Sequence, residues 1–257
     1  MSAVDLGSTY TAEWKTRPEA ATLSAEVIRP DSTPGTATVD QSTGMATIVA
    51  DMAGRWRISW STDTGITYTD VFDVWPADPR FIISVQDALT GLNAGRANSE
   101  YIDDLRLYIA AATPVIEDIT GPVIAQAKTR VFTSGNSLIV LPAATSEVLD
   151  VMVDGQLYTG WSEEFGILYA GAVGSSAVFP GTRVTVSWQE GGAQVPPNIR
   201  LAARELVRHW VQIGKQYAGG SGVRSDPGDE VFTPSGFAVP RRVVELCAPN
   251  QQIGGFA

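Results

Sequence analysis

The stretch "WPADPR", residues 75–80, separates two kinds of hydrophobic pattern. Before it, apolar and polar residues alternate, so that Trp56, Ile58 and Trp60 share one face of a predicted strand. After it, apolar residues recur at steps of three and four, which is the helical period. Because one segment cannot satisfy both periods, we predict that the chain changes architecture at these two prolines.

The N-terminal unit, residues 1–76, is predicted to be a small β-sandwich. Turn residues follow one another every 8–12 positions, as in the stretch "RPDSTPG". Its tryptophans suit a core, and stacking against carbohydrate is the alternative.

The second unit, residues 80–257, is predicted to combine helices with a β module, so the whole chain is expected to be α+β. Ser84 is placed to cap the first helix and Gly121 to end the second. The predicted segments are helices at 84–91, 99–119 and 197–215, a β module at 126–190 and an extended C-terminal arm at 216–257, which holds at most a short helix around Val243.

Two hairpins are predicted inside the β module. The first joins "KTRVF" to "LIVLP" through "TSGNS". The second turns at Asp154-Gly155, a pair that suits a type I′ turn.

The charge of the chain argues against general binding to nucleic acid or to anionic membranes. The net charge is −10, and both targets attract basic surfaces. The basic side chains gather at the C-terminal end: residues 200–257 carry seven basic and five acidic ones, against five and twelve in residues 81–199. With one cysteine, no long apolar run and no signal-peptide pattern, we expect a protein made in the cytoplasm.

We find no catalytic or metal-binding pattern and expect neither an enzyme nor a cofactor. His209 is the single histidine, and zinc sites or histidine triads need partners that are missing. The acid pairs Asp103-Asp104 and Glu163-Glu164 are adjacent and so point apart. The stretch "GGSGVR" lacks the strand, helix start and Lys-Ser/Thr ending of a phosphate loop.

Two basic features remain as candidate contact sites. Arg204, Arg208 and Lys215 lie around the last long helix, either as a solvated face or as a surface that meets an acidic neighbour. The glycine-rich stretch 217–236 is expected to order only on a partner, with Arg224 as its anchor. Ordering about 20 residues costs on the order of 20–40 kcal/mol, so apolar residues must be buried with it. The predicted contacts of the arm are Arg224, Val231, Phe232, Phe237, Arg241 and Arg242.

Residues 80–257 resemble the head-to-tail adaptor (connector) proteins of tailed bacteriophages. The likeness rests on "YIDDLRLYIAAATPVIEDITGPVI", "NSLIVLPAATSEVLDVMVDGQLY", "RVTVSWQEGG" and "PPNIRLAARELVRHW". The shared plan is a helix that ends in a glycine turn, a β module, a strand that ends in Gly-Gly, and a second long helix. Residues 1–76 resemble an added immunoglobulin-like domain.

The resemblance implies a virion protein, assembled in the host cytoplasm, that forms a ring of commonly twelve subunits. Such a ring binds the portal and the next head-completion or tail protein, and DNA passes through it without specific binding. Helices form the ring wall, while loops and the C-terminal segment reach the portal. The alternative function is a tail or surface binding module that uses the immunoglobulin-like domain for recognition.

Overall fold

The computed structural model of the protein describes residues 3–18, 21–92, 99–142, 145–218 and 239–250. Strands and helices both occur in these ranges, which confirms the predicted mixture of α and β structure. The chain divides into two compact units, Met1–Pro79 with Ala97–Leu107 (unit 1) and Arg80–Arg96 with Tyr108–Ala257 (unit 2). The first crossing between them therefore lies inside the proline-rich stretch.

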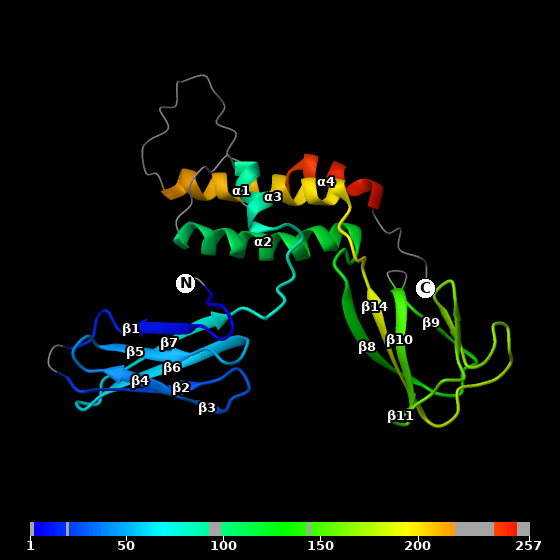
Figure 1. Cartoon of the computed structure of the whole chain (residues 1–257), viewed down its shortest axis with the longest axis horizontal. Helices are drawn as coiled ribbons and strands as arrows, with labels where there is room; N and C mark the ends of the chain where they lie inside the picture. Colours follow the sequence, from blue (N-terminus) through cyan, green and yellow to red (C-terminus); the bar gives the residue numbers. More distant parts are fainter. Residues whose placement is uncertain (1–2, 19–20, 93–98, 143–144, 219–238, 251–257) are drawn as a thin grey trace, which may run out of the picture. The chain divides into compact units, whose positions relative to one another are not determined.

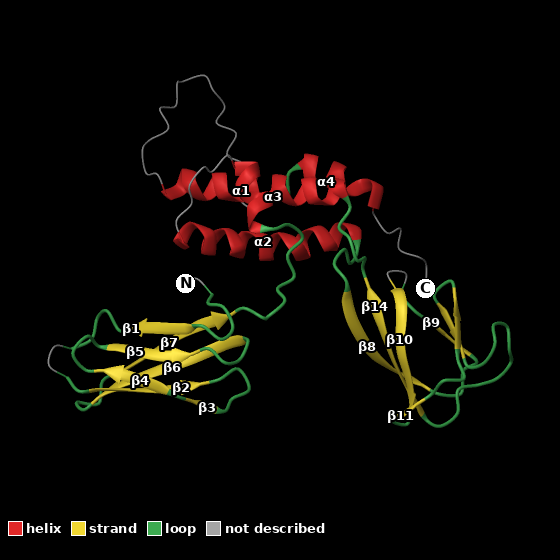
Figure 2. Ribbon diagram, viewed as in Figure 1, coloured by secondary structure: helices red, strands yellow, loops and turns green. Residues whose placement is uncertain are grey.

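Seven strands of unit 1 form two antiparallel sheets (Figures 1 and 2). The strand orders are β1-β5-β4 and β3-β2-β6-β7. Side chains from both sheets share one buried core, so these strands make a two-layer β-sandwich. The strands are β1 (Thr9–Glu13), β2 (Leu23–Ile28), β3 (Pro34–Gly35), β4 (Ala37–Asp40), β5 (Met45–Val49), β6 (Gly54–Thr62) and β7 (Thr67–Val74).

Strand β6 supplies the centre of this core, as its alternation predicts. Trp56, Ile58 and Trp60 are each 1% exposed. The Trp56 indole N–H donates to the carbonyl oxygen of Met52 at 2.9 Å, so its buried polar atom is paired. Trp14, which directly follows β1, is buried as well. These tryptophans are core residues and offer no carbohydrate platform.

Unit 2 contains the remaining strands and helices, except that the second helix begins in unit 1 and continues in unit 2. The helix ends follow the predicted chemistry. The Ser84 hydroxyl accepts a hydrogen bond from the Asp87 N–H at 3.0 Å and caps the first helix. Gly121, at φ 78°, follows the second helix. The helices are α1 (Val85–Leu92), α2 (Ser99–Thr120), α3 (Pro197–Ala218) and α4 (Arg241–Cys247), with a 3-10 turn at Ala248–Asn250.

Helix α3 is buried on more of its circumference than the sequence stripe indicates. The predicted stripe is buried throughout: Ile199, Ala203, Leu206, Trp210 and Ile213. Ala202, Val207 and Val211 are buried too, because α1 and α4 both pack on α3. Helix α3 is therefore the central helix of unit 2.

The β module lies between α2 and α3 in sequence and consists of two small sheets (Figure 2). Their orders are β11-β10-β14-β8 and β12-β13-β9. Val151, Leu168 and Val184 are fully buried between them. The strands are β8 (Gln126–Thr133), β9 (Leu138–Val140), β10 (Thr145–Val153), β11 (Gln156–Leu157), β12 (Ser162–Glu164), β13 (Ile167–Tyr169) and β14 (Arg183–Glu190).

Of the two predicted hairpins, the second is correct and the first is wrong. Asp154 and Gly155 have φ values of 48° and 83°, the positive values that a type I′ turn needs, and β10 pairs with β11 across them. Strands β8 and β9 do not pair with each other: β8 pairs with β14, and β9 with β13. An eight-residue register with β14 satisfies far more of the β8 backbone than a three-residue strand can.

The two connections between the helices and the β module run side by side. The Gly192 N–H donates to the Val123 carbonyl oxygen at 3.0 Å, and Ile124 forms a parallel bridge with Gly192. Gly191 has φ 78°, and a Cβ there would lie 2.6 Å from the Ile124 carbonyl oxygen. Glycine is thus required for conformation and for space at this junction.

Gly191→Ala should therefore lower the free energy of unfolding by about 2 kcal/mol or more, because the positive φ and the backbone clash both oppose a side chain. Gly135→Ala is the matched control, since Gly135 also has a positive φ but no atom within 4 Å of its added Cβ. That control should cost about 1 kcal/mol. Urea unfolding of the two variants measures the difference, and equal losses would contradict the close approach.

Candidate functional site

A shallow hollow of about 180 Å³ lies between α3 and the start of α4. Val243 and Cys247 of α4 are fully buried, which fixes α4 against the rest of unit 2. The Asn198 side-chain amide donates to the Leu246 carbonyl oxygen at 2.8 Å and ties α4 to the first turn of α3. Burial also raises the pKa of the Cys247 thiol. The residues that line the hollow are Glu205, Arg208, His209, Gln212, Pro240 and Arg242.

The charges of the hollow favour an anionic group. Arg208 and Glu205 form an ion pair within α3. Arg242 forms no ion pair within the described part of the chain, whereas the neighbouring Arg241 pairs with Glu245 at 2.9 Å. Two guanidinium groups against one carboxylate leave an excess positive charge, which suits a carboxylate from another surface.

The hollow brings together two residues that the sequence placed in separate sets. Arg208 belongs to the predicted ring-wall face and Arg242 to the predicted arm, 34 positions further along the chain by their numbers. The α4 helix makes this possible by folding back onto α3. From the sequence, His209 and Glu205 were not predicted to belong to this site. The available signal was their spacing, because residues four positions apart lie on the same face of a helix.

The other predicted contact residues are placed differently. The Arg204 side chain lies against α1, since a Cβ at Gly91 would be 3.4 Å from its Nε atom. The Lys215 side chain lies outside the described residues. So do Arg224, Val231, Phe232 and Phe237, together with the glycine-rich stretch around them.

Two basic residues in the first half of α3, Arg200 and Arg204, contact α1. Arg200 Nη2 donates to Asp87 Oδ2 at 2.9 Å, next to the Arg204–Gly91 contact. This hydrogen bond lowers the pKa of the Asp87 carboxyl. A lowered pKa means that the contact stabilises the fold above the ordinary carboxyl pKa and is lost as the pH falls through the lowered value. The face therefore divides into a structural half near α1 and an accessible half at the hollow.

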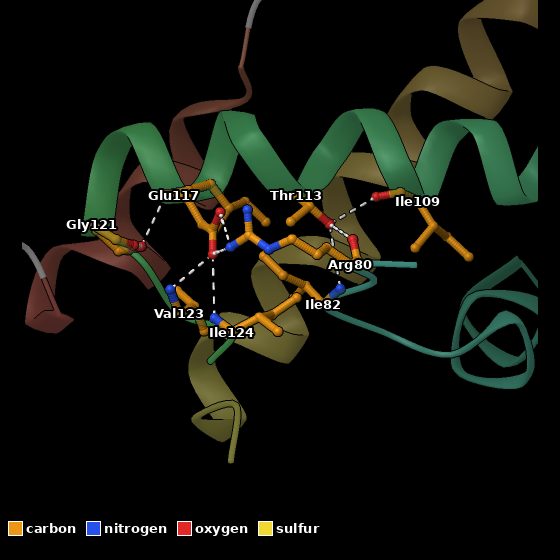
Figure 3. Close-up of polar contacts among 10 residues, drawn as sticks. Arg80, Ile82, Ile109, Thr113, Glu117, Gly121, Val123 and Ile124 are labelled. Carbon is orange, nitrogen blue, oxygen red and sulfur yellow. Dashed lines mark hydrogen bonds and ion pairs between the residues drawn. The ribbon is translucent and has the colours of Figure 1, made fainter. Parts of the chain in front are cut away.

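A second polar cluster, at the C-terminal end of α2, anchors the start of unit 2 (Figure 3). The side chain of Glu117 is only 12% exposed. Its Oε1 atom accepts hydrogen bonds from Arg80 Nη2 at 2.7 Å and from the backbone N–H groups of Val123 at 2.9 Å and Ile124 at 3.2 Å. One carboxylate thus joins the segment before α1, helix α2 and the connection to β8. We call this set the Glu117 clasp.

Thr113, one turn earlier on α2, holds the same incoming segment (Figure 3). Its hydroxyl donates to the Arg80 carbonyl oxygen at 3.0 Å and accepts from the Ile82 N–H at 3.4 Å. The hydroxyl also lies 3.2 Å from the Ile109 carbonyl oxygen. The backbone on both sides of Phe81 is therefore fixed to α2.

The described residues contain no group of three or more His, Cys, Asp or Glu side chains that could hold a metal ion. Glu163 and Glu164 lie exposed on β12, and Asp103 and Asp104 lie on α2. Among the helices that the structure describes, none combines the length and the apolar character of a membrane span.

No protein-family model matches the chain, and no curated protein matches it. Among solved structures it is similar to the Bacteroides ovatus SGBP-B of the mixed-linkage glucan utilization locus, solved with a mixed-linkage heptasaccharide. The identity is 13% and the TM-score 0.21, over 72% of this chain and 39% of that one. The chain thus spans well under half the length of that protein, and so low a TM-score carries neither fold nor ligand across.

The Glu117 clasp should contribute more to the free energy of unfolding than an exposed ion pair does. Glu117→Ala leaves two backbone N–H groups and Arg80 without their shared acceptor, so we expect a loss of about 2–4 kcal/mol in the free energy of unfolding. Asp73→Ala is the control, because the Arg55–Asp73 pair has side chains 68% and 48% exposed. Its removal should cost less than about 1 kcal/mol. Urea unfolding compares the two, and a Glu117→Ala loss as small as the control would refute the clasp.

Proposed function

We propose that this chain is a structural virion protein of a tailed bacteriophage. It forms a ring below the portal, connects the DNA-filled head to the tail and continues the DNA channel. The observation that carries the proposal is the basic hollow, in which Arg208 and Arg242 converge on a chain whose net charge is −10. A carboxylate from a neighbouring subunit or from the portal would be its ligand.

Identical acidic chains need such a site in order to assemble. At a net charge of −10 the general interaction between copies is repulsive, so a stable contact requires local charge pairing. A head-to-tail contact joins two different surfaces, and a closed ring satisfies both on every subunit. The basic hollow supplies one of these two surfaces.

The order of elements in unit 2 supports the proposal. The β module follows α2 and precedes α3, and α4 folds back onto α3. This is the helix, β module, long helix and tail order that the resemblance to head-to-tail adaptors implies. The acidic balance also suits a DNA channel, because like charge keeps phosphates from adhering to its wall.

The sandwich of unit 1 fits an appended immunoglobulin-like domain. It has seven strands in sheets of three and four, and Val4 makes a parallel bridge to Val74 on the last strand. The alternative function, a tail or surface binding module, relied on tryptophans exposed on this domain. Of its four tryptophans, Trp14, Trp56 and Trp60 are buried and Trp75 is half-buried, so none of them is fully exposed and that support is weak.

Arg242→Glu and Arg208→Glu should each weaken ring assembly at least tenfold, which is about 1.4 kcal/mol per contact, because each reverses a charge of the hollow. Arg57→Glu on the exposed side of β6 makes the same charge change in unit 1 and should leave assembly unchanged. Sedimentation velocity and negative-stain imaging, on the protein alone and mixed with portal, measure the outcome. A wild-type chain that stays monomeric in both preparations would overturn the proposed function.

A further inference from the structure

The most exposed large apolar residue of the described chain is held in a strained conformation. Phe165 is 93% exposed and has φ 52°. With Gly166, at φ 76°, it forms a two-residue turn between β12 and β13, which Glu164 and Ile167 close as a cross-strand pair. Such turns favour Asn, Asp or Gly at the first position, and a bulky residue there costs about 1–2 kcal/mol.

The exposure of Phe165 is not compensated within the described chain. A smaller residue would make the turn more easily, and a polar residue would suit the solvent better. Local strain of this kind clusters at functional sites.

Two strands of the three-stranded sheet that carries this turn, β9 and β13, give its outer face apolar side chains. Along the register, Val140 pairs with Ile167, and Leu138 pairs with Tyr169. Val140 is 67% exposed and Leu138 43% exposed, whereas Ile139 and Leu168, on the opposite face, are buried in the module core. We call the surface formed by Leu138, Val140, Phe165, Ile167 and Tyr169 the tip face.

One carboxylate borders the tip face. Glu164 lies in the same cross-strand row as Ile167 and Val140, whereas its neighbour Glu163 pairs with Leu168 and so lies on the opposite face of the strand. The Glu163 side chain accepts a hydrogen bond from the Gly166 N–H at 2.7 Å, whereas Glu164 forms no ion pair with any described residue. A partner for this surface should therefore offer apolar side chains next to basic ones.

Strand β8, in the other sheet of the same module, has that chemistry. It is an edge strand that pairs with β14 over all eight residues without a bulge, and no described strand pairs with its other edge. Residues 127–131 are all exposed, with Val131 45% exposed. Lys128 and Arg130 share one face, and the Arg130 guanidinium lies 5.4 Å from the Phe132 ring centre. We call Lys128, Arg130 and Phe132, which share one face of the strand, the β8 edge; Val131 lies on the opposite face.

Two copies of the β8 edge would pair poorly with each other. An antiparallel self-pairing that aligns residues 127–131 brings Lys128 and Arg130 of the two copies close together, and like charges opposite each other destabilise a sheet. The tip face has the opposite charge and also exposes apolar side chains. Strands β8 and β9 are drawn at opposite sides of the module in Figure 1.

We propose that the tip face of one copy docks on the β8 edge of a second copy, with Phe165 as the apolar anchor and Glu164 paired to Arg130. Such a contact is heterologous, since it joins two different surfaces and repeats around a ring. It rests on the proposed function and deepens it by naming a contact between subunits that lies outside the helices. This contact would cover the open edge of β8 and bury the exposed side chain of Phe165.

Replacement of Phe165 separates stability from assembly. Phe165→Asn removes the anchor and places a residue that tolerates positive φ in the turn. We expect the urea midpoint of the β module to be unchanged or raised, while the protein concentration for half-assembly rises at least tenfold. Val173→Asn is the control, because Val173 is a 49% exposed residue in a loop of the same module and lies outside the tip face. It should leave assembly unchanged.

A reciprocal charge exchange tests the partner surface. Arg130→Glu and Glu164→Arg should each raise the half-assembly concentration about tenfold, and the double variant should return it towards the wild-type value. Analytical ultracentrifugation of the full chain measures all of these. If wild type forms rings and the Phe165 and exchange variants assemble equally well, the tip-face contact is overturned while the ring stands. If wild type forms no ring, both fall.

Discussion

Unit 2 depends on one largely enclosed carboxylate. Glu117 accepts hydrogen bonds from the guanidinium of Arg80 and from two backbone N–H groups just after α2, and it is almost fully enclosed. These donors come from segments that would otherwise end in unpaired polar groups at the close of a helix. The clasp therefore fixes where the chain enters the helices and where it leaves for the β module. Gly191 then allows the returning strand to pass against the outgoing one.

Although the chain is acidic overall, a few of its basic side chains remain accessible in small patches. Arg200 and Arg204 are used internally, against α1. Arg208 and Arg242 are left accessible in the hollow, and Lys128 and Arg130 are left accessible on β8. In the proposed ring, where each chain has a net charge of −10, sparse basic patches would give directional attraction between copies against a repulsive background, which favours one mode of contact over many.

The two proposed contact surfaces differ in how they are held. The hollow lies on packed helices, where Val243 and Cys247 secure α4 and the arginine positions are set by the helical backbone. The tip of the β12–β13 hairpin is small and strained, and its aromatic side chain is offered to solvent. A rigid basic site and a projecting apolar anchor are complementary ways to join subunits, one through charge and one through burial.

The sequence by itself determined the mixture of strands and helices, the buried face of β6, the caps at Ser84 and Gly121, and the Asp154-Gly155 turn. Each depends on residues close together in the chain, whose period or backbone preference acts locally. Only the tertiary structure decided that β8 pairs with β14 and not with β9, that α4 brings Arg242 beside Arg208, and that Glu117 serves three segments. Those outcomes join residues far apart in sequence, and they follow from which pairing satisfies the most backbone and buries the most apolar surface.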